Sequence, residues 1–300
     1  MDRYVQHHSF PISGLRAVEL SVPDINKAKD FYTTVWGLSL AGEVDGRLYL
    51  RGRGCAPYLL SLSKGPVAVE SVIWEAADDT DLAALRQRMI DAGGSDATRV
   101  AEVDRLGGGT GFTLRDPAGR RISIVQGGER AEPQEGKSLP THLAHVNINT
   151  SDMHRDIAFY EQGMGFELTD QSKIMSFLRT NTDHHMIVLA DAEVDTLNHI
   201  SFMQETWEEV MTASGKMCDA GFPIGWGPGR HGPGDNVFAY FVDPFGIVIE
   251  HTAEVLKVDE SYRIGGPEDW VWPKGRTDQW GIAPPKTETC KKAQLAIPFS

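Results

Sequence analysis

The pattern of apolar and polar residues predicts a strand followed by a helix near the start of the chain. Residues 15–22 alternate with a period of two, which is typical of a strand with one buried face. A helix is expected next, with Asp24 at its N-cap and its end near Gly37. Its apolar positions recur at helical spacing and are Ile25, Ala28, Phe31 and Tyr32.

The same pattern returns in the second half of the chain. Residues 143–168 align on residues 15–40 without a gap, and Asp152 takes the place of Asp24. The residues shared at matched positions are Leu15/Leu143, Val18/Val146, Asp24/Asp152, Phe31/Phe159, Tyr32/Tyr160, Gly37/Gly165 and Leu40/Leu168. A repeat of this length predicts two copies of one structural unit, each able to bury its own core.

Further strands are predicted after each helix, and an Asp-Pro-x-Gly turn introduces the last strand of each copy. In the first copy they are residues 48–50, 58–63, 71–75 and 121–125, and in the second 174–179, 185–189, 198–203, 239–242 and 247–251. We therefore expect an α+β fold with two tandem modules, residues 1–135 and residues 136–300, joined by a polar linker at 127–140.

The periodicity disappears at about residue 259, and the tail from there to residue 300 is rich in Trp and Pro. Trp270, Trp272 and Trp280 stand among many glycines and prolines, so an irregular segment is expected. It is too aromatic for a free tail, and we expect it to wrap over the body of the protein. Packing alone is the favoured interpretation, and covering a functional site is the alternative.

Composition and charge exclude several classes of partner. Hydrophobic residues at 41% and charged residues at 24% are ordinary for a globular protein, and no apolar run is long enough for a membrane helix. A net charge of −13 repels nucleic acid and anionic membrane surfaces. Three widely spaced cysteines and the absence of a signal-peptide pattern favour a cytoplasmic location.

The two copies differ at three equivalent positions that carry chemistry. Ala17 aligns on His145 and Ser71 on His199, and with one residue of slip Ser123 aligns on Glu250. A single histidine in an apolar strand is more often a hydrogen-bonded core residue than a ligand. Agreement of three such residues with the repeat favours a metal site instead. Two imidazoles and one carboxylate leave open positions on a ferrous ion, so we predict that the second module alone binds metal.

At these residues the chain resembles the vicinal oxygen chelate superfamily, and its second half is similar to the type I extradiol catechol dioxygenases. The motifs concerned are HVNI around His145, LNHISF around His199, GPGRHG around His231 and AYFVDPFGIVIE ending at Glu250. The resemblance implies modules of paired βαβββ units. It also implies His145, His199 and Glu250 as ligands of Fe(II), with Mn(II) as an alternative, in the C-terminal module only.

The resemblance further implies three catalytic residues. His185 matches the family's histidine on the dioxygen side of the metal, where an imidazole can transfer a proton. The connection from His185 to His199 is one residue shorter than in that family, which leaves His184 as an alternative for this role. His231 and Tyr240 match polar groups beside the substrate hydroxyls, although a loop histidine and a strand tyrosine are also common without such a role.

The expected function is extradiol ring cleavage of a catechol with dioxygen, in aromatic compound catabolism. The expected partners are the catecholic substrate, dioxygen and further copies of the chain, commonly a tetramer in this family. The substrate could be monocyclic, biphenyl-like or fused. The alternatives are a glyoxalase-like lyase or isomerase, which uses metal without oxygen, and a metal-free binding protein of the same superfamily.

Overall fold

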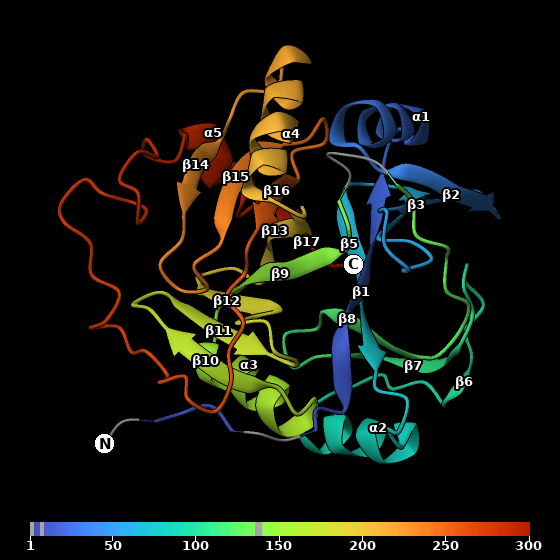
Figure 1. Ribbon diagram of the computed structural model, residues 1–300. Helices are drawn as coiled ribbons and strands as arrows, with labels where there is room; N and C mark the ends of the chain where they lie inside the picture. Colours follow the sequence, from blue (N-terminus) through green and yellow to red (C-terminus); the bar gives the residue numbers. More distant parts are fainter. Residues whose placement is uncertain (1–2, 7–8, 136–139) are drawn as a thin grey trace.

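Two mixed β-sheets with the same strand order form the fold (Figure 1). The structure, a computed structural model, describes residues 3–6, 9–135 and 140–300. Within these residues the first sheet has the order β2-β3-β4-β1-β5-β8-β7-β6, and the second repeats it as β10-β11-β12-β9-β13-β16-β15-β14. Each sheet thus contains two βαβββ units, which confirms the predicted α+β fold of tandem modules.

The described elements of the first module begin with the predicted strand and helix. They are β1 (Ile12–Val22), α1 (Ile25–Asp30), its π-helical continuation η1 (Phe31–Trp36), β2 (Ser39–Val44), β3 (Arg47–Arg51), β4 (Leu60–Lys64), β5 (Ala68–Ala76), α2 (Leu82–Asp91), β6 (Ala101–Glu102), β7 (Thr110–Arg115) and β8 (Arg121–Gln126). The predicted N-cap is present, since the Asp24 side chain accepts a hydrogen bond from Lys27 N. The helix ends at Gly37, whose φ of 96° suits glycine.

The second module repeats this order of elements. They are β9 (Leu143–Thr150), α3 (Met153–Ala158), its continuation η2 (Phe159–Gly163), β10 (Glu167–Gln171), β11 (Met175–Arg179), β12 (Ile187–Asp191), β13 (Thr196–Met203), α4 (Trp207–Asp219), β14 (Trp226–Arg230), β15 (Val237–Val242), β16 (Val248–Ala253), α5 (Glu288–Ala293) and β17 (Ile297–Pro298). Asp152 caps α3 as Asp24 caps α1, accepting from Arg155 N.

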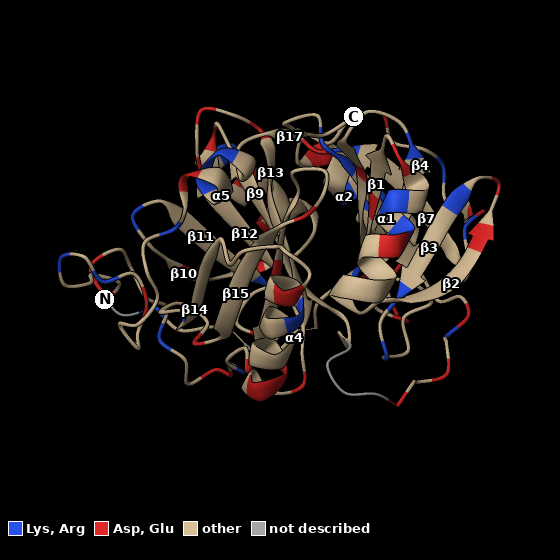
Figure 2. Cartoon of the chain, turned by 90° about the horizontal axis from the view of Figure 1, so that it is seen from above, with Lys and Arg blue, Asp and Glu red and all other residues tan. Residues whose placement is uncertain are grey.

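The main hydrophobic core extends from one module into the other. Buried residues of both halves form a continuous cluster. The first helix of the first module, α1 with its continuation η1, lies beside α4 of the second module (Figures 1 and 2). Trp36 at its end packs edge to face on Phe202 and stacks on His251, with ring centroids 3.6 Å apart. An aromatic side chain of the first module thus packs against the second sheet and stabilises it.

Strand register confirms the predicted equivalence of the metal positions. In the second sheet His145 pairs with Ser201, and Ser201 pairs with Glu250 on the next strand. In the first sheet Ala17 pairs with Ile73, and Ile73 pairs with Ser123. Because Ile73 and Ser201 occupy the same place, Ala17 corresponds to His145, Ser71 to His199 and Ser123 to Glu250.

The C-terminal tail is irregular up to α5, so the expectation of an irregular segment through residue 300 is wrong at its end. Thr287 caps α5 by accepting a hydrogen bond from Cys290 N, and β17 pairs with β13. Among the described residues, the helices are too short or too polar to cross a bilayer. Residues 136–139 of the predicted linker, which begin the predicted second module, lie outside the described residues, and the module limits stay predictions.

Candidate metal centre

Three side chains from three neighbouring strands converge at the centre of the second sheet. His145 lies on β9, His199 on β13 and Glu250 on β16, with exposed fractions of 2%, 3% and 0%. The Nε2 atoms of the two histidines are 3.0 Å apart, and each lies 3.2 Å from Oε2 of Glu250. The structure therefore brings together the three residues predicted as ligands.

A bulge in the sheet orients His199. The register of β13 against β9 shifts between Leu197 and His199, which lets the neighbouring Asn198 reach back to the imidazole. His199 Nδ1 lies 2.9 Å from Asn198 Oδ1, and this oxygen also accepts a hydrogen bond from Gln294 Nε2. An amide oxygen can only accept, so Nδ1 carries the proton and the Nε2 lone pair faces the centre.

Burial and mutual contact set the charges of the cluster. Burial disfavours the Glu250 carboxylate, but the imidazoles of His145, His199 and His231 outweigh it and hold the pKa of Glu250 well below its ordinary value. Burial lowers the pKa of His199 to about 4 against the opposing effect of Glu250. At neutral pH this leaves the anionic Glu250 carboxylate beside the neutral imidazole of His199, which is the protonation state that binds a metal ion.

The donor set fits a divalent cation. The three ligand atoms lie within 4.8 Å of one another, and neither Glu250 oxygen accepts a hydrogen bond from the described residues. A buried carboxylate without a donor is costly unless a cation neutralises it. Two imidazoles and one carboxylate suit Fe(II) and also accept Mn(II).

His231 and Tyr240 lie together on one side of the centre. Tyr240 is paired with Glu250 across β15 and β16, which fixes its place beside the triad. Its hydroxyl is 3.1 Å from His231 Nε2 and 3.5 Å from His199 Nε2. His231 Nε2 is also 3.6 Å from Oε1 of Glu250, and its ring stacks on Phe238. Burial raises the pKa of Tyr240 well above its ordinary value, so the phenol keeps its proton.

His185 lies on another side of the centre, against His145, with ring centroids 4.6 Å apart. His184 points away from the centre, because its Nε2 is 2.7 Å from Oδ2 of the buried Asp170. Its Nδ1 is 3.0 Å from Nδ1 of His185. Of the two competing histidines, only His185 is among the described residues that line the cavity at the triad.

The Asp170–His184 contact fixes the proton position on His185. The carboxylate accepts from His184 Nε2–H, so Nδ1 of a neutral His184 is an acceptor. With His184 in this neutral form, His185 donates its Nδ1–H to His184 and keeps its Nε2 lone pair free. Burial lowers the pKa of His185 well below its ordinary value, so this imidazole is neutral before a proton reaches it.

A glycine loop closes against His185. Gly234 has a φ of +81°, and a Cβ added there would lie 2.6 Å from Cε1 of His185. A Cβ added at Gly232, in the same loop, would lie 2.6 Å from Cζ2 of Trp272 in the tail. Both positions require glycine for close approach, which explains why His231 stands in a glycine-rich segment.

The triad opens into a cavity of about 270 Å³. His145, His199, His185, His231 and Tyr240 line it, and Glu250 lies behind them. The tail contributes several further lining residues, which are Trp270, Trp272, Thr277, Lys286 and Gln294. The favoured interpretation that the tail only packs on the body is therefore wrong, and it covers the site.

Sequence analysis missed several residues of this cavity. Asn147 could have been found, because it lies two residues after His145 on the same face of β9. Lys286 and Gln294 belong to the tail, where no periodicity indicates which side chains turn inward. Trp226 precedes a glycine and a proline in β14, a strand whose composition is unusual for a strand.

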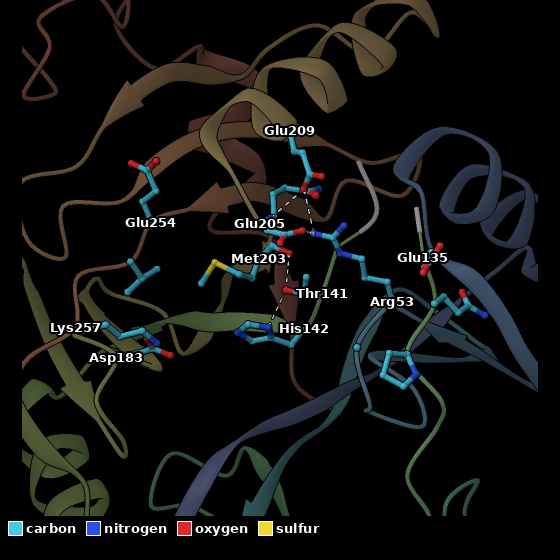
Figure 3. A pocket seen from close by; sticks show the side chains of 15 residues that line it. Arg53, Glu135, Thr141, His142, Asp183, Met203, Glu205, Glu209, Glu254 and Lys257 are labelled. Atoms are coloured by element: carbon cyan, nitrogen blue, oxygen red, sulfur yellow. Dashed lines mark hydrogen bonds and ion pairs between the residues drawn. The ribbon is translucent and has the colours of Figure 1, made fainter. Parts of the chain in front are cut away.

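A larger cavity of about 840 Å³ lies away from the triad, between residues of both modules (Figure 3). Arg53 of the first module reaches across to Glu209 at 3.3 Å and to Glu205. Thr141 Oγ1 lies 2.8 Å from Nδ1 of His142. None of the six predicted site residues is among the described residues that line this cavity, and its charges largely pair with one another.

Comparison with known proteins supports the interpretation of the fold and the site. The sequence profile of the Glyoxalase/Bleomycin resistance protein/Dioxygenase superfamily matches residues 14–124 and 142–251. The chain belongs to this superfamily. The two matched segments contain the repeated strands of the two modules, and the second contains His145, His199 and Glu250.

The more specific relatives are distant. The chain is 26% identical over 281 residues to metapyrocatechase 2 of Cupriavidus necator, covering 85% of this chain and 83% of the relative. It is 22% identical to the manganese-dependent 2,3-dihydroxybiphenyl 1,2-dioxygenase of Geobacillus genomosp. 3, covering 76% and 80%. Its fold matches the Mn(II)-bound glyoxalase from Novosphingobium aromaticivorans with a TM-score of 0.86, 28% identity and coverage of 93% and 94%. The resemblance to extradiol dioxygenases is confirmed at this distance.

Proposed function

We propose that this protein is an extradiol dioxygenase that opens the ring of a catechol-type aromatic diol, with dioxygen and a mononuclear non-haem Fe(II), in aromatic compound catabolism. The supporting observation is the triad of His145, His199 and Glu250 at a cavity flanked by His231 and Tyr240 on one side and His185 on another. Extradiol relatives spanning most of the chain agree with this proposal.

The metal would be held by Nε2 of His145, Nε2 of His199 and the Glu250 carboxylate. When bound, a ferrous ion with open coordination positions can bind both the diol and dioxygen and provide an electron path between them. In the net reaction the ring bond beside the diol breaks and both oxygen atoms enter the product. The product is a muconic semialdehyde type of compound, and no external reductant is consumed.

His231 and Tyr240 would orient the diol. Their polar atoms lie 3.1 Å apart, and both are close to the triad. A phenol that keeps its proton can donate to a diol oxygen, and a neutral imidazole can accept from the other hydroxyl. The aromatic walls formed by Trp226 and Phe177 would exclude water around the ring.

His185 would move protons on the dioxygen side. Its Nδ1 is occupied by His184, so Nε2 is the atom that can accept a proton released in the cavity and return it later. Asp170 and His184 would act through His185 by fixing its orientation and its tautomer. We assign the acid and base role to His185 rather than to His184.

The proposal is tested by loading the protein with Fe(II) without oxygen and then adding catechols in air. The panel includes monocyclic, biphenyl-like and fused catechols. We expect oxygen uptake equal to the catechol consumed and a yellow product. Loading with Mn(II) in parallel decides between the two metals. Metal binding without oxygen uptake for every catechol would contradict the proposal.

A glyoxalase-like lyase or isomerase is the second candidate, because the fold matches a Mn(II)-bound glyoxalase over most of both chains. Such an enzyme needs no dioxygen. The hemithioacetal of methylglyoxal and glutathione, added under nitrogen to the same metal-loaded protein, separates the two functions. We expect no turnover of this substrate. A protein that binds no metal would instead favour the metal-free binding function.

The remaining expectations accompany this proposal. We propose a homo-oligomer, commonly a tetramer in this family, whose mass light scattering would measure. We also propose a cytoplasmic location and the module limits 1–135 and 136–300. Limited proteolysis between the modules tests the limits. These points do not affect the assignment of the site.

A further inference from the structure

The cavity at the triad carries positive charge in a protein that is otherwise acidic. The whole chain has 42 acidic and 29 basic residues. Among the described residues that line the cavity, Lys173 and Lys286 are the lysines, and none is Asp or Glu. Lys173 is exposed at the rim, whereas Lys286 is partly buried. The side chains that line the cavity therefore favour a ligand that carries negative charge.

Lys286 has no carboxylate partner among the described residues. Its Nζ lies 2.7 Å from the amide oxygen Oε1 of Gln294. It also lies 4.5 Å from the ring centroid of Trp226 and 5.7 Å from that of Tyr240. Burial lowers the pKa of Lys286 against the opposing effects of Cys290 and Glu250, and an anion in direct contact would offset more of that cost. Aromatic faces and one amide position the ammonium without neutralising it.

The diol itself does not account for this charge. A divalent ion brings two positive charges, and Glu250 together with an ionised diol supplies the matching negative charge. The charge of Lys286 is additional. It lies on the Tyr240 side of the cavity, over Trp226, where a ring substituent could reach it.

We infer that Lys286 binds an anionic substituent, such as a carboxylate, on the aromatic ring of the substrate. This inference rests on the proposed dioxygenase function and specifies its substrate as a carboxylated catechol. Trp226 would form an apolar wall beside the ring, and the ammonium would donate charge-assisted hydrogen bonds to the substituent. Lys286 is then a specificity-determining residue supplied by the tail.

The experiment compares carboxylated catechols with their methyl esters, which have the same ring and no charge. Suitable pairs are 3,4-dihydroxybenzoate, 3,4-dihydroxyphenylacetate and 3-(2,3-dihydroxyphenyl)propionate, each with its ester. Binding is measured by calorimetry without oxygen and kcat/KM by oxygen uptake. For at least one pair, we expect the wild type to prefer the acid by about tenfold to a hundredfold, as for a hydrogen-bonded charge pair.

Variants at Lys286 identify the source of that preference. Lys286→Met should remove the preference for the acid while leaving kcat/KM for the ester unchanged within about threefold. Lys286→Glu should reverse the preference. Lys286→Arg should keep most of it, which also shows that the position tolerates substitution. The matched control is Lys291→Met, because Lys291 lies on the same tail, is exposed and pairs with Glu288 instead. Its acid-to-ester ratio should equal that of the wild type.

The outcomes separate this inference from the proposed function. Turnover of catechols with the same acid-to-ester ratio in the wild type and in Lys286→Met overturns the inference and keeps the dioxygenase. Equal losses on acid and ester also overturn it, because Lys286 would then serve the diol or the fold. If neither acids nor esters are consumed but another catechol of the panel is, the inference fails and the dioxygenase proposal stands. If no catechol is consumed, the dioxygenase proposal fails and the inference falls with it.

Discussion

The two modules share a sheet topology but not a site, and strand register allows a comparison residue by residue. His145, His199 and Glu250 of the second module correspond to Ala17, Ser71 and Ser123 of the first. His185 corresponds to Tyr58, because β4 and β12 have equivalent registers against β1 and β9. Tyr240 corresponds in the same way to Thr113. Every predicted chemical group on these strands is replaced in the first module.

In the first module the residues at these positions hydrogen-bond to each other or pack against apolar side chains. Ser71 Oγ lies 2.7 Å from Ser123 Oγ, so the two hydroxyls hydrogen-bond to each other. Ala17 is packed with Tyr58 and other apolar side chains in a small buried cluster. In the second module the Glu250 oxygens accept no hydrogen bond from the described residues. The fold therefore does not require the site, and the unsatisfied carboxylate marks the module that binds a metal.

The largest effect is expected from paired substitutions at the equivalent positions 199 and 71. His199→Ala removes a ligand and should lower kcat/KM by about a thousandfold or more, with loss of bound metal. Ser71→Ala removes one buried hydrogen bond and should cost only about 1 kcal/mol of stability with full activity. Metal analysis measures the bound metal, oxygen uptake measures kcat/KM and urea denaturation measures the free energy of unfolding. Metal loss in Ser71→Ala would break the comparison, because it would make the first module part of the site.

A second pair compares His185 with Tyr58. His185→Ala should keep the metal and lower kcat by about a hundredfold, because the proton-transfer group is lost. Tyr58→Phe, in the first module, should leave kcat and metal content unchanged. An equal loss of metal and rate in His185→Ala would show that this side chain supports the fold of the centre instead of the chemistry.

The comparison also shows what the sequence could predict. The repeat revealed the central strands and the ligands, because strands that build a duplicated sheet keep their period and their register. The strands that were not predicted are β2, β6, β7, β10, β14 and β17. The residue pattern also left α2 and α4 unpredicted, although their caps were visible in the sequence. Asp81 precedes α2 and accepts from Ala83 N and Ala84 N, and Thr206 precedes α4 and accepts from Glu209 N. An Asx or Thr cap before an apolar helical period was sufficient evidence for both.

Other features depend on tertiary contacts that no local pattern records. The position of Trp36 against the second sheet follows from a helix that crosses to the other module. The inward turn of Lys286 depends on Trp226, which is distant in the sequence, and on Gln294 at the C-cap of α5. His184 and His185 were distinguished only when Asp170 was placed beside His184.

Asp170→Asn tests the support of His185 with a smaller expected effect. The first module has Gly42 at the corresponding position of β2, so this carboxylate belongs to the second module alone. An amide can accept from His184 but holds no charge, so we expect kcat to fall about tenfold with metal affinity unchanged. Nitrogen NMR of the metal-free protein should show the Nδ1–H tautomer of His185 in the wild type and a mixture in Asp170→Asn. A single unchanged tautomer would contradict the proposed support.

The last difference between the modules concerns their Asp-Pro-x-Gly turns. Asp116 of the first turn is paired with Arg120 at 2.7 Å, whereas the second turn has no such cation, and Asp243 accepts instead from the Tyr32 hydroxyl at 2.9 Å. Burial, opposed by backbone N–H groups and Tyr32, raises the pKa of Asp243 from 3.8 to about 6. The folded state thus binds the proton more tightly than the unfolded chain.

Stability from this proton is present below about pH 4 and is lost as pH rises through 6. Asp243→Asn stays neutral, so its stability relative to the wild type should increase from pH 4 to pH 7 by on the order of 2 kcal/mol. Urea denaturation of the metal-free proteins at both pH values measures this, since metal ligands then do not contribute. A constant difference between the two proteins would mean that Asp243 is ionised throughout this range, so that the Tyr32 hydroxyl and the backbone amides compensate the charge of the buried carboxylate.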